Sequence, residues 1–167
     1  MTFETDPTIN QGDLTSHLID WDTYLETANP QKLMSQTGEP EVSSGGRVYA
    51  FDTPKGLEGD GAIVVMLPGT MDTPTTHEKG EVEWHRILDG KGFMIKGSSL
   101  IRLERGVRVL VDSGVPHCIV ATEGLVDVVV SPFGYDQANE APVDFENPKD
   151  FGMDLFDIFL AALSRRK

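Results

Sequence analysis

The sequence predicts an all-β fold, a sandwich or a barrel, built around a single domain. Short runs rich in β-branched and aromatic residues follow one another from Arg47 to Phe133, and turn residues separate them. A chain of 167 residues is long enough for one domain with a substantial core. The sequence shows no periodic repeat, phosphate-binding glycine loop or serine-nucleophile motif. These observations favour a β domain over a nucleotide-binding or serine-hydrolase fold.

The β-rich runs are the expected strands, and their spacing is typical of sandwiches and barrels. They are RVYAF (47–51), AIVVML (62–67), EVEWHRIL (81–88), FMIKG (93–97), SLIRLE (99–104), RVLVD (108–112), CIVAT (118–122) and LVDVVVSPF (125–133). We interpret DGKG at residues 89–92 as a hairpin turn, because glycine accepts the positive φ that such turns require. A second turn is expected at Glu123 and Gly124.

The chain divides into three regions. Residues 1–46 are expected to form an N-terminal arm and short elements that pack on the barrel, residues 47–135 the barrel, and residues 136–167 an acidic loop and a C-terminal amphipathic helix. Within the first region, HLIDW (17–21) is interpreted as a short strand or an ordered turn. Residues 22–28 are interpreted as a helical turn that ends at Asn29 and Pro30.

Charge and composition restrict the class of partner. The net charge is −13, which argues against nucleic acid and anionic membrane surfaces. The N-terminal residues do not resemble a secretory signal, and no apolar stretch approaches the roughly 20 residues of a membrane helix. One cysteine, Cys118, excludes an internal disulfide framework and is interpreted as a small packed residue. We therefore expect a soluble cytoplasmic protein whose partner is a small molecule.

Three of the four histidines lie in two short segments. His77 and His85 lie between Thr76 and Gly90, and His117 ends DSGVPH. Successive side chains of a strand point to opposite faces, so Glu81, Glu83, His85, Ile87 and Asp89 are expected to share one face. By the same rule Cys118 should face away from His117. His17, far from these segments, is expected at the surface or in an interface.

These segments also resemble the two motifs of the cupin family. Six residues separate Glu83 from Gly90, and ILDG ends the strand, as at the end of the first cupin motif. DSGVPH at residues 112–117 resembles the PxGxxH of the second motif. The resemblance extends from about Gly61 to Tyr135. It implies a cupin-type double-stranded β-helix, a jelly-roll barrel, with the N-terminal extension and the C-terminal helix outside it.

The first motif departs from the pattern of metal-binding cupins. Such cupins carry HxH a few residues before the glutamate, and an ungapped alignment places Thr76 and Glu78 there. A one-residue deletion places His77 and Lys79 there instead, so one expected ligand is missing in either alignment. Two histidines and one carboxylate remain, a set that suits Fe(II), Mn(II), Ni(II) or Zn(II) and leaves positions for a substrate. The candidate metal ligands are His77, Glu83 and His117.

The resemblance implies a small-molecule pocket, and metal-binding cupins include dioxygenases, decarboxylases, isomerases and lyases. We therefore expect a metal-dependent enzyme that acts on a small organic substrate and, as is common among cupins, forms a homodimer. The nearby groups that can move protons are His85, Glu81 and Glu78, and the unperturbed pKa of His85 lies closest to neutrality. EWHRILDGKGF is similar to the corresponding strand of acireductone dioxygenases, but the missing HxH argues against carrying their activity over.

Alternatives remain open at this point. His85 can replace the missing ligand, or it can belong to a substrate wall. The histidines and Glu83 can also form a hydrogen-bonded cluster in a metal-free barrel. That barrel would resemble cupin sugar epimerases and isomerases, in which a histidine base and an acidic partner transfer protons. A third alternative is a non-catalytic sensor or binding module, which would tolerate a degenerate metal motif.

Overall fold

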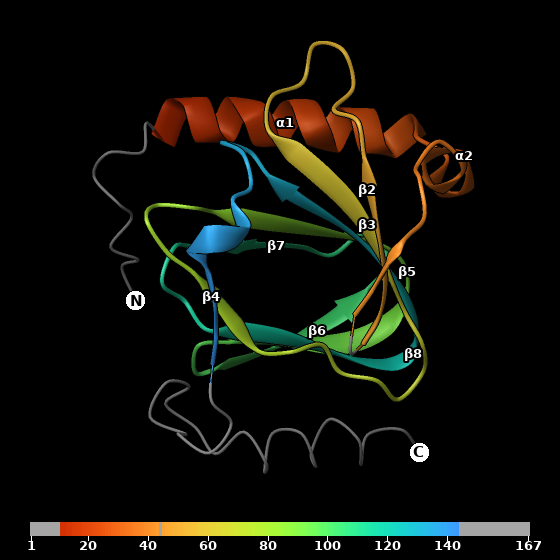
Figure 1. Ribbon diagram of the computed structural model, residues 1–167, viewed down its shortest axis with the longest axis vertical. Coiled ribbons are helices and arrows are strands. Elements are labelled where there is room, and N and C mark those ends of the chain that lie inside the picture. The colour runs from red at the N-terminus through yellow and green to blue at the C-terminus, as the bar shows by residue number, and fades with distance from the viewer. Residues whose placement is uncertain (1–10, 44, 144–167) are drawn as a thin grey trace.

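The structure is a computed structural model that describes residues 11–43 and 45–143, and a curled antiparallel sheet makes up most of it (Figure 1). The helices and strands, in chain order, are α1 (Gln11–Thr27), α2 (Pro30–Ser35), β1 (Glu41–Val42), β2 (Gly46–Phe51), β3 (Asp60–Met66), β4 (Thr75–His77), β5 (Glu83–Lys96), β6 (Ser99–Glu104), β7 (Arg108–Val111), β8 (His117–Ser131), the 3-10 helix η1 (Gln137–Asn139) and β9 (Glu140–Pro142). The predicted C-terminal helix lies outside the described residues. The all-β prediction is confirmed.

Two long strands organise the sheet. β5 pairs with β6, β7 and β8, and β8 pairs with β3, β4 and β5, in every case antiparallel. β3, followed by β2 and β1, pairs with the second half of β8, and β4, followed by β9, pairs with its first residue. The first residues of β5 and β8 lie at opposite ends of their antiparallel ladder, and the curl of the sheet brings them and the end of β4 together inside the barrel.

The course of β5 corrects two expectations. Residues 89–92 do not form a hairpin turn, because β5 continues through them to Lys96. The register on β8 shifts between Ile87 and Asp89, where β5 has one extra residue, which is a β-bulge. Beyond the bulge the alternation is reversed, so Asp89 is exposed instead of sharing the inner face with Ile87. β8 likewise continues through the expected turn at residues 123–124.

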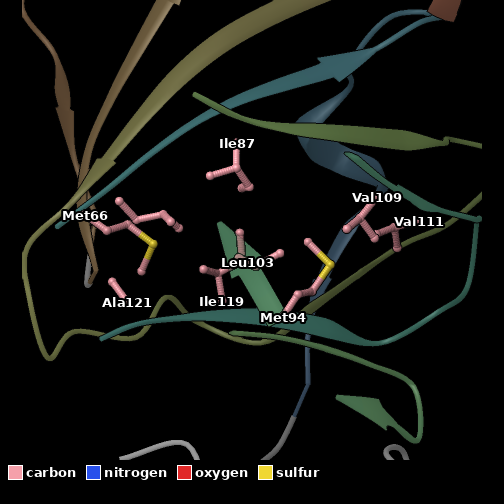
Figure 2. Close-up of a cluster of buried hydrophobic side chains, with 9 residues drawn as sticks. Met66, Ile87, Met94, Leu103, Val109, Val111, Ile119 and Ala121 are labelled. Atoms are coloured by element: carbon pink, nitrogen blue, oxygen red, sulfur yellow. The ribbon is translucent and has the colours of Figure 1, made fainter. Parts of the chain in front are cut away.

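The barrel interior holds an apolar core (Figure 2). Its buried members come from β3, β5, β6, β7 and β8, and their side chains point toward one another in the close-up. They are Met66, Ile87, Met94, Leu103, Val109, Val111, Ile119, Ala121 and Leu125. This core fills one part of the interior, and the buried polar residues described below occupy another.

Helix α1 covers the outer face of the sheet (Figure 1). Trp21 is fully buried against β3, β5 and β8, and its Nε1 donates a hydrogen bond to the Glu58 carbonyl at 2.7 Å. The strand or turn expected at residues 17–21 is therefore wrong, because these residues belong to α1. The helix ends before Asn29 and Pro30, as expected. No helix in residues 11–43 or 45–143 is long and apolar enough to cross a membrane.

The outer face of β5 also binds α1 through charge. Arg86, which follows His85 on the strand, donates to the Asp22 carbonyl at 2.5 Å and pairs with the Asp22 carboxylate at 3.1 Å. Arg108 on β7 pairs with the same carboxylate at 2.6 Å. Arg86 therefore points away from His85, as the alternation of the strand predicts.

Candidate metal centre

His77, Glu83 and His117 each lie at the end of a strand, and two of the three segments are joined by hydrogen bonds. His77 ends β4, Glu83 begins β5 and His117 begins β8. The amide of Gly114 donates to the His77 carbonyl at 2.6 Å, and the Ser113 hydroxyl donates to the same carbonyl at 3.2 Å. The loop that leads into β8 is thus fastened to the end of β4. The two segments singled out in the sequence are adjacent in the structure.

The three side chains converge on a small volume inside the barrel. One ligand atom from each lies within 4.8 Å of the others. Glu83 Oε2 lies beside His77 Nε2 and 3.5 Å from His117 Nε2. The exposed fractions are 6% for His77, 9% for Glu83 and 4% for His117, so bulk water is largely excluded from this group.

Nδ1 of His77 and Nδ1 of His117 each lie beside a hydrogen-bond acceptor. His117 Nδ1 lies 3.1 Å from the Val115 carbonyl, which can only accept, so Nδ1 carries the proton. His77 Nδ1 lies 3.3 Å from Glu81 Oε1. Outer partners of this kind fix the tautomer of a metal-binding histidine and direct its other nitrogen to the ion. In both rings that other nitrogen, Nε2, faces Glu83.

His85 lies on the other side of the same carboxylate. Its Nε2 is 3.2 Å from Glu83 Oε1, whereas Oε2 faces the other two histidines. The prediction that Glu83 and His85 share a face is thereby confirmed. His85 Nδ1 lies 2.6 Å from Oδ2 of Asp127, a fully buried residue of β8. His85 is not part of the group of three within 4.8 Å.

The donor atoms fit a divalent transition metal. Glu83 Oε2 is buried without a hydrogen bond in the described part of the chain, although two imidazole nitrogens lie close to it. Lone pairs of a carboxylate and two imidazoles that face one another repel unless a cation or protons lie between them. Imidazole and carboxylate are ligands of Fe, Mn, Ni and Zn. The three protein ligands would leave coordination positions open.

Two acidic residues of the expected site lie in different environments. Glu81 is buried, and its Oε2 accepts hydrogen bonds from the Asp136 amide and from Asn139 Nδ2, both at 3.2 Å. Glu78 is exposed on the turn after β4, and its amide donates to the Asn139 carbonyl at 2.8 Å. The structure therefore brings Glu81 and His85 to the three candidate ligands but leaves Glu78 exposed.

Sequence reasoning missed two carboxyl groups near this group, that of Asp127, which is fully buried, and that of Asp72, a partly buried residue. Asp127 is the only charged residue in the apolar run from Leu125 to Val130, a signal that could have marked it as functional. Asp72 Oδ1 accepts a hydrogen bond from the Ile119 amide at 2.6 Å. Burial raises the pKa of Asp72 to about 7, against the lowering effect of that hydrogen bond and of the nearby histidines. No comparable signal surrounds Asp72 in the sequence.

The carboxylates and histidines shift one another's pKa values. Burial would lower the pKa of His85, but the charges of Asp127 and Glu83 outweigh it and raise the pKa well above its usual value. Burial would raise the pKa of Glu83, but the charge of His85 and the close imidazoles of His117 and His77 hold it well below its usual range. Without a metal, the group would therefore keep at least one proton on an imidazole at neutral pH.

This proton makes the stability of the metal-free protein depend on pH. We expect the free energy of unfolding to fall as the pH rises above about 6.5. The folded state binds the His85 proton more tightly than the unfolded state, so the stabilisation is complete below about pH 6.5 and is lost through the folded-state pKa. Asp72, whose pKa is also raised, contributes a fall of the same sign up to about pH 7.

Urea unfolding over this pH range measures how steeply the free energy of unfolding falls with pH. His85→Leu should flatten this dependence, and rising stability would contradict the assignment.

Cys118 lies outside this group. It is buried and packs with Ile95 and Val143. Burial, followed by the charge of Asp72, raises the pKa of its thiol. The residue is a packed, unreactive thiol, as expected from its position after His117.

Comparisons with known proteins support the same architecture. The family model of the cupin domain (Cupin_2) matches residues 62–130, which extend from β3 into β8. A cupin-2 domain protein of Rhodospirillum rubrum has a TM-score of 0.60 and 17% identity, over 77% of this chain and 87% of that chain. No curated protein matches the sequence significantly.

Two further similar structures are enzymes. Pac13 of Streptomyces, described as a nucleoside dehydratase and solved with uridine, has a TM-score of 0.56 and 11% identity, over 66% of this chain and 88% of that chain. Oxalate decarboxylase of Bacillus subtilis has a TM-score of 0.53 and 23% identity, over 65% of this chain and 31% of that chain. At these identities the likeness concerns the fold. The family match over residues 62–130 and the shared fold confirm the predicted resemblance to the cupin superfamily.

Proposed function

We propose that the protein is a metal-dependent enzyme of the dioxygenase, lyase or isomerase type that acts on a small organic substrate. One observation carries the proposal. His77, Glu83 and His117 place three ligand atoms within 4.8 Å of one another inside a barrel. Both histidines have an outer acceptor that turns Nε2 toward the centre. Fe(II), Mn(II), Ni(II) or Zn(II) suits this donor set.

Different residues of the chain would bind the metal, orient a ligand, hold a proton and exclude water. His77, Glu83 and His117 would hold the ion, which when bound polarises a substrate oxygen or activates dioxygen. Glu81 would orient His77 through Nδ1. His85 would hold a proton on the far side of Glu83, where Asp127 stabilises the charged imidazole. The surrounding apolar core would exclude water from the reaction.

Elemental analysis of protein purified without a metal-affinity tag tests the proposal. The wild type should contain close to one equivalent of Fe, Mn, Ni or Zn, and His117→Ala should contain almost none. His85→Ala, the matched control in the same cluster, should keep the metal and lose activity. Absence of metal from the wild type after reconstitution with each of these ions would refute the assignment. Circular dichroism would establish that His117→Ala keeps the barrel.

A metal-free enzyme is the second candidate. It is favoured by the position of His85, whose ring lies between the carboxylates of Asp127 and Glu83 and binds a proton tightly. Such an imidazolium can donate a proton to a substrate, as in a sugar epimerase or isomerase. Turnover by protein that contains no metal would favour this candidate. Ligand binding with neither metal nor turnover would favour a sensor. The homodimer and the cytoplasmic location remain predictions.

A further inference from the structure

A pocket of about 290 Å³ lies next to the candidate metal centre. It is formed by the turn after β4 and the segment after β8. Its lining includes Lys79, Glu81, Phe133, Tyr135, Asp136 and Asn139. Glu81 belongs to both sites, because its Oε1 lies 3.3 Å from His77 Nδ1. We propose that this pocket binds a neutral polyhydroxylated ring of the sugar or cyclitol type. Its role as the substrate subsite rests on the proposed function, whereas the binding itself does not.

Two aromatic side chains give the pocket an apolar surface. Phe133 and Tyr135 are each 46% exposed, and both line the pocket. The Tyr135 hydroxyl donates to Glu140 Oε2 at 2.6 Å, and its ring lies edge-on to His77 with centroids 6.4 Å apart. Phe133 packs against the His17 ring at 5.5 Å. Both rings are therefore held in place, with part of their surface free to contact the C–H face of a ligand ring.

A buried acceptor lies beside these rings. Asn139 donates from Nδ2 to Glu81 at 3.2 Å, and this contact fixes the orientation of its amide. Asn139 Oδ1 is buried and has no hydrogen-bond partner among the described residues. An unsatisfied buried oxygen is costly, and a ligand that donates a hydrogen bond relieves the cost. A hydroxyl group of the ligand would supply that donor.

Lys79 supplies a donor under backbone strain. Its φ is 54°, and the following Gly80 has a φ of 78°. The left-handed region disfavours residues with a Cβ, so glycine or asparagine is the usual residue at such a position. Within the described ranges, no ion pair or hydrogen bond is formed by the Lys79 side chain. Lys79 is exposed and lines the pocket, so its ammonium group is available to donate to a ligand there.

The balance of charge favours a neutral ligand. The carboxylates of Glu81 and Asp136 line the pocket, and Glu140 lies behind Tyr135. An anion would meet these groups and a protein of net charge −13, whereas a cation would meet Lys79. Hydroxyl groups can donate to Asn139 and accept from Lys79 at the same time. A hydroxylated ring therefore uses every feature of the pocket.

Nuclear magnetic resonance titration of the full-length, metal-free chain tests the proposal. The probes are methyl glucopyranosides, methyl galactopyranosides and myo-inositol, and at least one should shift the amide signals of Gly80, Gly134 and Asp136. Tyr135→Ala should weaken binding by about tenfold or more, and Tyr135→Phe, which keeps the ring, by less than about threefold. Lys79→Gly should weaken binding about tenfold, yet leave the melting temperature unchanged or higher, because it relieves the backbone strain.

The chain offers an internal control. A second pocket of about 290 Å³, near Lys91 and Arg105, has charged groups but no aromatic ring. Lys91→Gln should not affect binding, and the amides around it should not shift. Binding by none of the probes would overturn the proposal. Binding of choline that becomes stronger in Lys79→Gly would also overturn it, because the ligand would then be a cation. Binding of inorganic phosphate but of none of the sugars would overturn it as well. The titration uses metal-free protein. A negative result would therefore refute the ligand pocket without bearing on the metal centre, which the elemental analysis tests.

Discussion

Replacement of Glu83 by glutamine should lower the affinity of the protein for its metal by more than about 100-fold. The amide keeps the size of the side chain but removes the negative charge, and Oε2 is the atom that faces both His77 and His117. Neutral amides are weak ligands of transition metals compared with carboxylates. Competition with a chelator of known affinity, followed by elemental analysis, measures the change.

Glu81→Gln is the matched control for this experiment. Glu81 is also buried, carries the same charge and lies beside His77, but on the Nδ1 side that faces away from the centre. Loss of an outer partner typically costs about 10–100-fold in metal affinity, so this variant should still bind one equivalent when metal is in excess. Equal losses in both variants would indicate that the effect comes from charge near the site. The metal would then not be bound by Glu83 itself.

Asp127→Leu should lower the free energy of unfolding of the metal-free protein by about 3–5 kcal/mol. The substitution removes the carboxylate from His85 Nδ1, 2.6 Å away, and leaves a buried imidazole without that partner. Breaking a buried pair on one side costs more than replacing both partners by apolar groups. Urea unfolding followed by tryptophan fluorescence measures the loss.

The double variant Asp127→Leu with His85→Leu separates this explanation from a simple packing effect. With both polar groups removed, most of the stability should return, and the remaining cost should be below about 1.5 kcal/mol. Purely additive losses would show that the two residues do not stabilise each other. They would also remove the basis for His85 as a proton-holding group.

Much of the barrel and part of the site follow from local rules. The alternation of side chains along a strand placed Glu83 and His85 on one face and Arg86 on the other, and the structure agrees. The sequence also indicated that His77, Glu83 and His117 belong together, because they lie in two short segments that contain three of the four histidines. The alternation of side chains depends only on neighbouring residues in the strand, so it can be read from a single sequence.

Features that depend on distant partners were harder to predict. Leu14, Trp21 and Leu25 are buried in α1 at spacings of seven and four residues, a helical pattern that polar neighbours obscured. Asp127 reaches His85 across a strand pair, a contact that depends on how β5 pairs with β8. DGKG at residues 89–92 suits a hairpin turn or a bulge equally, and only the length of the pairing between β5 and β8 decides between them.

The bulge between Ile87 and Asp89 has a consequence for how this protein tolerates change in chain length. It divides β5 into two halves whose inward positions follow opposite numbering, odd up to Ile87 and even at Met94. Deletion of one residue at the bulge would remove this break, and continuous alternation would keep both Ile87 and Met94 inward, with Glu83 and His85 in their places. The bulge is therefore the place in β5 where the loss of one residue would leave both the apolar core and the candidate ligand positions unchanged.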